Sequence, residues 1–177
     1  MYHSIYPGIR TWYQSVQRLL QKDRTLTNCF GRKCRFMDSW GIDLWKAAYS
    51  FLPQSSVVDS LNQGMIRIYN DSDLCSNQGY NIDILAQVHD SILMQIPIDV
   101  IMQPEEFSAI QQRIYNYVSP TLTYNNRDFK IATDSKFGFN WGGASKTNTQ
   151  GMREVKSYAE LQTLLESVDE SRIGGLA

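Results

Sequence analysis

Two short apolar runs on either side of a His-Asp pair constrain the fold of this chain more than any other feature. Residues 82–86 and 92–97 are rich in β-branched and aliphatic side chains, and they flank His89 and Asp90. Runs of this length around a short polar turn are typical of a β-hairpin. A rigid hairpin fixes the carboxylate at its tip, and hard cations prefer such oxygens. The sequence therefore indicates that Asp90 is a candidate metal ligand.

Three segments have apolar residues at helical spacing. They are residues 7–22, 41–69 and 105–118, and Pro7 suits the first turn of the first one. Pro53 lies within the second segment, and proline removes a helical hydrogen bond. We therefore expect a long helical stretch that is interrupted near Pro53.

The segments between these helices predict strands and loops. Residues 25–37 are predicted to form a short hairpin with Gly31 at its bend, and residues 129–133 and 137–139 are predicted to be late strands. Residues 70–81 are polar and rich in turn formers, which predicts a surface loop. Together with the helices, these strands predict the α+β class.

The C-terminal segment has the pattern of a linker followed by a helix. Residues 148–151 are typical of a linker, and Ser157 with Glu160 has the spacing of a capping box. An apolar stripe follows, which either packs on its own domain or docks a partner. The stripe consists of Tyr158, Leu161, Leu164, Leu165 and Val168. Residues 169–177 are expected to be a frayed end.

Composition bounds the class of protein and its compartment. Hydrophobic residues make up 42% of the 177 residues, which is enough for a core. No run is long and apolar enough to span a membrane, and the N-terminus lacks the pattern of a signal peptide. The three cysteines lack metal-pair spacing, so we expect reduced thiols and a cytoplasmic location.

Five sequence blocks follow one another along residues 2–145. They are Tyr6–Trp12, Phe30–Arg35, Ala48–Asp59, Gln87–Ser91 and Gly138–Trp141. In this order they resemble the C-terminal part of a family A DNA polymerase, the group of bacterial polymerase I and phage replicases. The matching family patterns are FPxVRxW, FGRRR, AxNxPxQGTAAD, the QVHDE of motif C, and GxxW. The loose motifs and unusual tail favour a phage replicase.

The resemblance implies a division of the chain into three parts. Residues 1–40 correspond to the helix at the end of the fingers and the basic Phe-Gly-Arg turn. Residues 41–145 correspond to a portion of the palm, an antiparallel sheet with the motif C hairpin that is covered by helices. Residues 146–177 are the linker and a C-terminal helical extension, through which a replisome partner could dock.

The resemblance also implies the chemistry. Nucleotidyl transfer uses two metal ions, here Mg²⁺, held by one aspartate of motif A and one of motif C. Asp90 matches the aspartate of motif C, but no segment resembles motif A or the fingers helix that holds deoxynucleoside triphosphates. We therefore expect part of a DNA-directed DNA polymerase, which is inactive alone and needs an upstream fragment that carries these elements.

Several polar and basic residues match family positions that contact the primer–template DNA. The resemblance assigns Gln54, Gln87 and His89 to the minor-groove edge near the primer terminus. Two neighbours depart from the family, because Ser50 replaces asparagine and Lys46 replaces arginine. Ser50 therefore shortens or removes a contact with DNA, and Lys46 offers a point charge where arginine would offer a guanidinium fork.

The charge of the chain is uneven, although its net charge is −1. Residues 1–46 hold eight basic and three acidic side chains, so their net charge is +5 and that of the remainder is −6. A solvated helix followed by a basic turn would explain this cluster. Given the resemblance, we favour a patch that faces phosphates and includes Arg32, Lys33 and Arg35.

Ser91 stands where motif C of the family usually has glutamate. A serine can still orient a water molecule bound to the metal, so Asp90, Ser91 and His89 remain the candidate catalytic residues. Single-subunit RNA polymerases also carry His-Asp-Ser here, so part of such an enzyme is the second hypothesis. The third is a non-catalytic DNA-binding or regulatory remnant. The Phe-Gly-Arg turn, Gln54 and residues 138–141 fit the DNA polymerases better.

Overall fold

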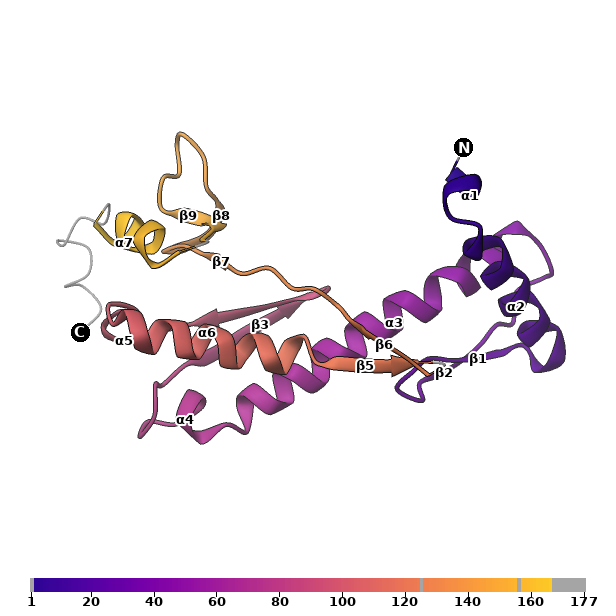
Figure 1. Ribbon diagram of the computed structural model, residues 1–177, viewed down its shortest axis with the longest axis horizontal. Helices are drawn as coiled ribbons and strands as arrows, with labels where there is room; N and C mark the ends of the chain where they lie inside the picture. The colour runs from indigo at the N-terminus through magenta and orange to yellow at the C-terminus, as the bar shows by residue number, and fades with distance from the viewer. Residues whose placement is uncertain (1, 125, 156, 167–177) are drawn as a thin grey trace.

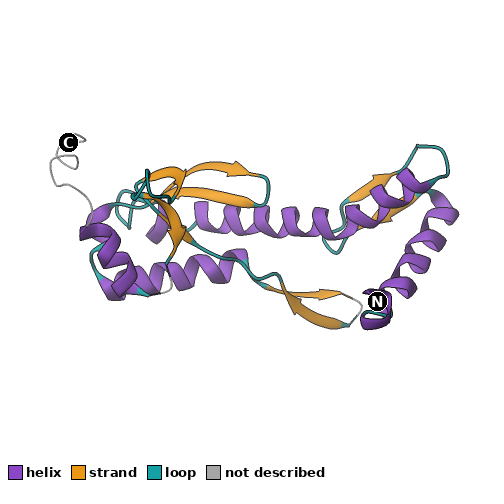
Figure 2. Ribbon diagram, turned by 90° about the horizontal axis from the view of Figure 1, so that it is seen from above, coloured by secondary structure: helices purple, strands orange, loops and turns teal. Residues whose placement is uncertain are grey.

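A single long helix, α3 (Ile42–Tyr69), runs through the molecule and joins two lobes (Figures 1 and 2). The structure is a computed structural model that describes residues 2–124, 126–155 and 157–166. The lobes have separate hydrophobic clusters, one on each half of α3. The fold is of the α+β class, as predicted, and its strands form small sheets.

The N-terminal lobe packs against the first half of α3. Its elements are α1 (Tyr2–Ile5), α2 (Gly8–Asp23), β1 (Thr25–Thr27) and β2 (Lys33–Arg35). The predicted helix and hairpin are therefore confirmed, and β1 pairs antiparallel with β2. The core of this lobe consists of Val16, Leu20, Leu26, Phe36, Leu44 and Ala48. Gly31 lies in the turn with φ 85°, a conformation that favours glycine.

The expected interruption of α3 at Pro53 does not occur, because the helix continues through it. A proline inside a helix costs about 3 kcal/mol or more, since it removes one backbone hydrogen bond and crowds the preceding turn. Burial of side chains on both sides of Pro53 offsets this cost, for example at Ala48 and Leu61. The Ser56 hydroxyl also donates a hydrogen bond of 2.7 Å to the Leu52 carbonyl.

The C-terminal lobe begins on the second half of α3. Its first elements are α4 (Ser72–Cys75), β3 (Asp83–Val88), β4 (Ser91–Gln95), α5 (Ile98–Ile101) and α6 (Pro104–Val118). The predicted hairpin is confirmed as the antiparallel pair β3–β4. Its inward face packs with α3 and α6 on a cluster that includes Ile68, Ile82 and Ile110. The hairpin is thus backed by helices on one side.

Residues 70–81 are not simply a surface loop, so this prediction is wrong. They contain α4, and both Leu74 and Asp71 are buried. Arg113 and Tyr117 of α6 satisfy the buried carboxylate, through a 2.6 Å ion pair and a 2.8 Å hydrogen bond to Asp71 Oδ2. The polar composition of the segment hides this anchoring, because its partners lie about 40 residues away.

After α6 the chain returns to the N-terminal lobe and then goes back. The remaining elements are β5 (Thr121–Tyr124), β6 (Arg127–Lys130), β7 (Lys136–Phe137), β8 (Asn140–Gly143), β9 (Gly151–Glu154) and α7 (Tyr158–Glu166). The hairpin β5–β6 extends toward the N-terminal lobe, and Figure 2 shows it set apart from α3. The predicted late strands overlap β6 and β7 only in part, since both strands begin earlier than predicted, and β9 begins at Gly151, the last residue of the predicted linker. It pairs with both β7 and β8 in one sheet.

Helix α7 packs on its own lobe, which is the first of the two predicted alternatives. Leu161 and Leu164 are buried against Phe107 of α6. The Ser157 hydroxyl accepts a hydrogen bond from the Glu160 N–H at 3.3 Å, as predicted for the cap. Val168 and the predicted frayed end lie outside the described residues. None of the described helices has the length and apolar character that crossing a membrane requires.

Candidate functional site

The tip of the hairpin β3–β4 consists of His89 and Asp90 alone. Val88 pairs with Ser91, so only two residues make the turn. His89 has φ 53°, in the left-handed region that such tight turns demand. Ser91 uses its hydroxyl locally, because it donates a 2.8 Å hydrogen bond to the Val88 carbonyl. The three predicted catalytic side chains are therefore exposed together at one tip.

The carboxylate of Asp90 is exposed at this tip. Among the described residues, no lysine or arginine forms an ion pair with it. Nor do three or more His, Cys, Asp or Glu side chains gather anywhere in the described part of the chain to hold a metal. A single carboxylate can occupy one position in the coordination sphere of Mg²⁺, whose other ligands are commonly water molecules and phosphate oxygens.

A hydrogen bond between side chains attaches the hairpin to α3. Gln87 Nε2 donates to Asn62 Oδ1 at 2.8 Å. Ile82, at the other end of the strand, lies in the cluster of Ile68, so β3 runs antiparallel to α3. The tip therefore points back along α3 toward Gln54, as Figure 1 shows for the hairpin as a whole. Gln87 is thus held by the fold rather than free at the tip.

The three predicted DNA contacts on α3 lie along one side of the helix. Lys46, Ser50 and Gln54 are spaced four residues apart, so they fall within an arc of about 80°. Lys46 and Gln54 are exposed, whereas Ser50 is half-buried. The Ser50 hydroxyl donates to the Ala47 carbonyl at 3.1 Å, which occupies its only proton.

The basic turn between β1 and β2 is organised by Asn28, which sequence analysis did not single out. Its carbonyl oxygen Oδ1 accepts the backbone N–H groups of Phe30 and Arg32, each at 2.9 Å. Its Nδ2 group donates to Asp59 Oδ2 at 2.7 Å and to the Ser55 hydroxyl at 3.0 Å. One buried side chain thus shapes the turn and attaches it to α3.

Arg32 makes a two-pronged ion pair with Asp59 of α3. Its Nη2 lies 2.5 Å from Asp59 Oδ1, and its Nε lies 2.9 Å from Oδ2. The hydrogen bond from Arg32 holds the pKa of Asp59 below its usual value, against the effect of burial, and Asn28 assists. Asp59 occurs in the third family-like block, but sequence analysis assigned it no role.

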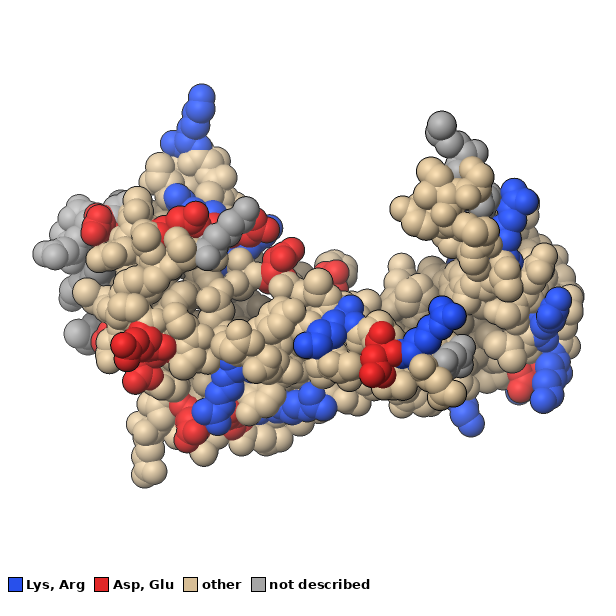
Figure 3. Space-filling view, in the orientation of Figure 1, with Lys and Arg blue, Asp and Glu red and all other residues tan. Residues whose placement is uncertain are grey.

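The other two basic residues of the turn lie on the exposed side of β2. Lys33 and Arg35 alternate with half-buried Cys34 along the strand, so both project away from the core. Figure 3 shows mostly lysine and arginine on the lobe that contains α2, and more aspartate and glutamate on the other lobe. The uneven charge of the sequence is therefore an uneven charge in space.

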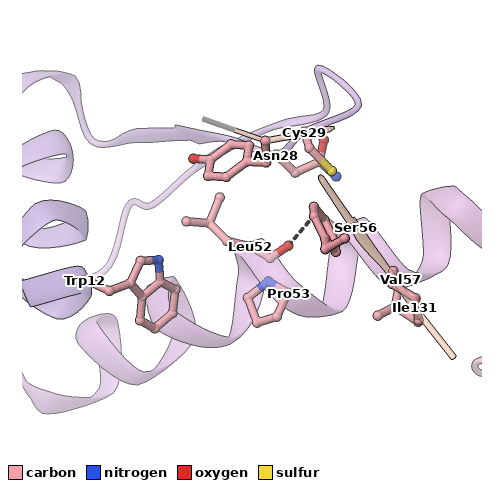
Figure 4. Close-up of a pocket in the computed structure, with 10 residues that line it drawn as sticks. Trp12, Asn28, Cys29, Leu52, Pro53, Ser56, Val57 and Ile131 are labelled. Carbon is pink, nitrogen blue, oxygen red and sulfur yellow. Dashed lines mark hydrogen bonds between the residues drawn. The ribbon is translucent and has the colours of Figure 1, made fainter. Parts of the chain in front are cut away.

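Two open hollows flank α3 in this region. One of about 280 Å³ is lined by Arg32, Phe51, Gln54, Ser55 and Val58. The other, of about 350 Å³, is mostly apolar and lies under the hairpin β5–β6 (Figure 4). Its walls include Trp12, Leu52, Pro53, Phe129 and Ile131. The walls of the first hollow are also mostly apolar, but they include the Arg32 guanidinium and the Gln54 amide as hydrogen-bond donors.

Comparisons of this chain with protein-family models, with curated proteins and with solved structures find no match. The function of the chain is therefore inferred from the motifs of its sequence and from the geometry described above.

Proposed function

We propose that this chain is the C-terminal part of a template-directed DNA polymerase of the family A type. The observation that carries the proposal is the two-residue tip, which presents Asp90 on a hairpin that helices back from behind. The resemblance of residues 87–91 to motif C requires a carboxylate in such a position. Gln54 and Gln87 lie along the same stretch of α3, where the proposal places the primer–template DNA.

In the proposed mechanism, Asp90 would supply one hard oxygen ligand to a Mg²⁺ site shared with the partner. When bound, metal ions at such sites activate the attacking oxygen and neutralise charge on the leaving group. His89 and Gln87 would contact the terminal base pair, and Lys33 and Arg35 would contact phosphates. Deoxynucleoside triphosphates would enter from the side of the missing partner. Such an enzyme would work in the cytoplasm, that of the host if it is a phage replicase.

The exposed area of the chain supports the need for a partner. A compact monomer of 20.4 kDa would expose about 8,800 Å². This chain exposes 12423 Å², which is about 3,600 Å² more. If the 14 residues outside the described ranges were fully exposed, they would account for at most about 2,200 Å² of it. The remaining excess of exposed area, about 1,400 Å², is larger than the roughly 800 Å² that each partner buries in a typical complex.

The experiment starts from tagged full-length chain purified from its own cells with the polypeptides that bind it. We expect the complex to extend a labelled primer on a template with Mg²⁺ and deoxynucleotides, and the chain alone to be inactive. Asp90→Asn should abolish extension, since it removes a metal ligand. Asp83→Asn is the matched control, because Asp83 is an exposed carboxylate at the other end of the same hairpin.

Four outcomes would contradict the proposal. Extension by the pure chain would show that it is not a fragment. An Asp90→Asn complex as active as wild type would remove Asp90 from the chemistry. Promoter-dependent RNA synthesis by the complex would instead favour the RNA polymerase hypothesis, which Ser91 supports through the His-Asp-Ser sequence. A complex that binds DNA without any synthesis would favour the non-catalytic remnant.

A further inference from the structure

The Arg32 guanidinium is divided between two environments. Its Nε and one hydrogen of Nη2 face Asp59, whose side chain is 11% exposed. The Arg32 side chain itself is 54% exposed and lines the hollow that it shares with Gln54 and Ser55. A guanidinium has five N–H donors, so Nη1 and the second hydrogen of Nη2 remain for a ligand.

The Asp59 carboxylate, which binds Arg32, is itself fixed in position. Asp59 sits on α3 and accepts a second hydrogen bond from Asn28, which also fixes the backbone of the turn at Arg32. The guanidinium is therefore positioned from both its ends, by its own backbone and by the carboxylate. A donor that is fixed before a ligand arrives loses less conformational entropy on binding.

We propose that Asp59 and Asn28 are positioning residues that aim Arg32 at a nucleic-acid phosphate in the hollow beside Gln54. The ligand class is a phosphodiester, because a planar fork of N–H donors matches its two free oxygens. This inference rests on the proposed function for the presence of DNA and for a phosphate contact by the basic turn, and it adds the two side chains that orient Arg32 and the hollow in which the phosphate would lie.

A simpler alternative makes the opposite prediction. If Asp59 only neutralises Arg32, its removal leaves one more positive charge on the surface and strengthens DNA binding. If Asp59 aims Arg32, its removal releases a flexible guanidinium and weakens binding. The substitution Asp59→Asn separates these two cases, since it keeps the shape of the side chain and removes its charge.

The experiment measures binding of a short fluorescein-labelled DNA duplex to the full-length chain by anisotropy, without divalent metal, over a series of potassium chloride concentrations. We expect Arg32→Gln to raise the Kd about tenfold and to reduce the slope of log K against log salt by about 0.9, the value for one phosphate. Asp59→Asn should raise the Kd about threefold or more, for loss of part of one contact.

Lys146→Gln is the matched control, because it removes one exposed positive charge from the loop between β8 and β9, and its Kd should stay near wild type. Arg32→Lys keeps the charge but loses the fork, so it should also weaken binding. If thermal melts show that Asp59→Asn does not fold, the Arg32→Lys variant alone tests whether Arg32 binds a phosphate through its fork. Binding by Asp59→Asn as tight as wild type, or by Arg32→Lys equal to wild type, overturns the proposal.

This assay is independent of synthesis. If DNA binding follows Arg32 and Asp59 while the purified complex extends no primer, the polymerase proposal fails and the phosphate site stands. If the complex extends primers but the Arg32 and Asp59 variants bind DNA like wild type, the phosphate site fails alone. Absence of DNA binding by the wild-type chain at low salt also overturns it.

Discussion

Gly64 marks the point where α6 crosses α3, and its replacement by alanine tests whether this contact fixes the C-terminal lobe. A Cβ atom at Gly64 would lie 2.8 Å from the Tyr117 carbonyl oxygen and 2.9 Å from Val118 Cα. Both atoms belong to the backbone of α6, so neither can move without displacing that helix. The hairpin β3–β4 packs on the same helix, and it would move too.

Two effects of opposite sign determine the size of the change. Alanine is favoured over glycine within a helix by about 1 kcal/mol. Insertion of a methyl group into a closely packed contact typically costs about 1–3 kcal/mol. Because the clash is with backbone atoms, we take the upper part of this range. The expected net loss in the free energy of unfolding is therefore about 1–2 kcal/mol.

Urea unfolding followed by circular dichroism measures this loss. Gly8→Ala is the control, because Gly8 also lies in a helix, but a Cβ atom added there would have no neighbour within 4 Å. It should leave stability unchanged or raise it by about 0.5 kcal/mol, through helix propensity alone. If Gly64→Ala proves more stable than wild type, the close crossing of α3 and α6 is wrong.

Two further predictions concern the Arg32–Asp59 ion pair and the hairpin tip. The pKa of Asp59 is lowered in the folded chain, so its carboxylate stabilises the fold. This stabilisation is fully present above the pKa of the unfolded state, near 4, and is lost as the pH falls through the lower pKa of the folded state. Urea unfolding should therefore show Asp59→Asn less stable than wild type by about 1–3 kcal/mol at neutral pH, with a difference that shrinks in acid, and a constant difference would contradict this. At the tip, His89→Val should be less stable than His89→Gly by about 1–2 kcal/mol, because only glycine adopts φ 53° without strain, and equal urea midpoints would refute this.

The hairpin at residues 82–97 could be predicted from sequence because its determinants are local. Two short apolar runs flank a polar turn, which is enough to predict two paired strands, although the irregularity in the pairing between Ile84 and Ala86 is not predicted. The helices α2 and α6 were predictable for the same reason, since one face of each is apolar. The position of Asp90 at the hairpin tip could therefore be predicted without knowledge of distant parts of the chain.

The features that sequence analysis missed depend on distant partners. Helix α3 continues through Pro53 because side chains on both sides of it are buried, which no local rule registers. Asp71 is buried because Arg113 lies beside it. Likewise, Arg32 was predicted as part of a basic patch that faces phosphates, but its carboxylate partner Asp59 comes 27 residues later and was not predicted. In each case the tertiary fold brings the partners together, and their spacing in the sequence does not reveal the contact.

The two halves of the candidate site are attached to neighbouring turns of one helix. Asp59 holds the basic turn of the N-terminal lobe, and Asn62 holds the hairpin of the C-terminal lobe. These residues are three apart, so they lie on adjacent sides of α3 with a rise of about 4.5 Å. The helical segment of α3 between Asp59 and Asn62 thus fixes the basic turn relative to the tip that carries Asp90. A kink at Pro53 would leave both attachments on the same side of the bend, so their relative geometry would survive it.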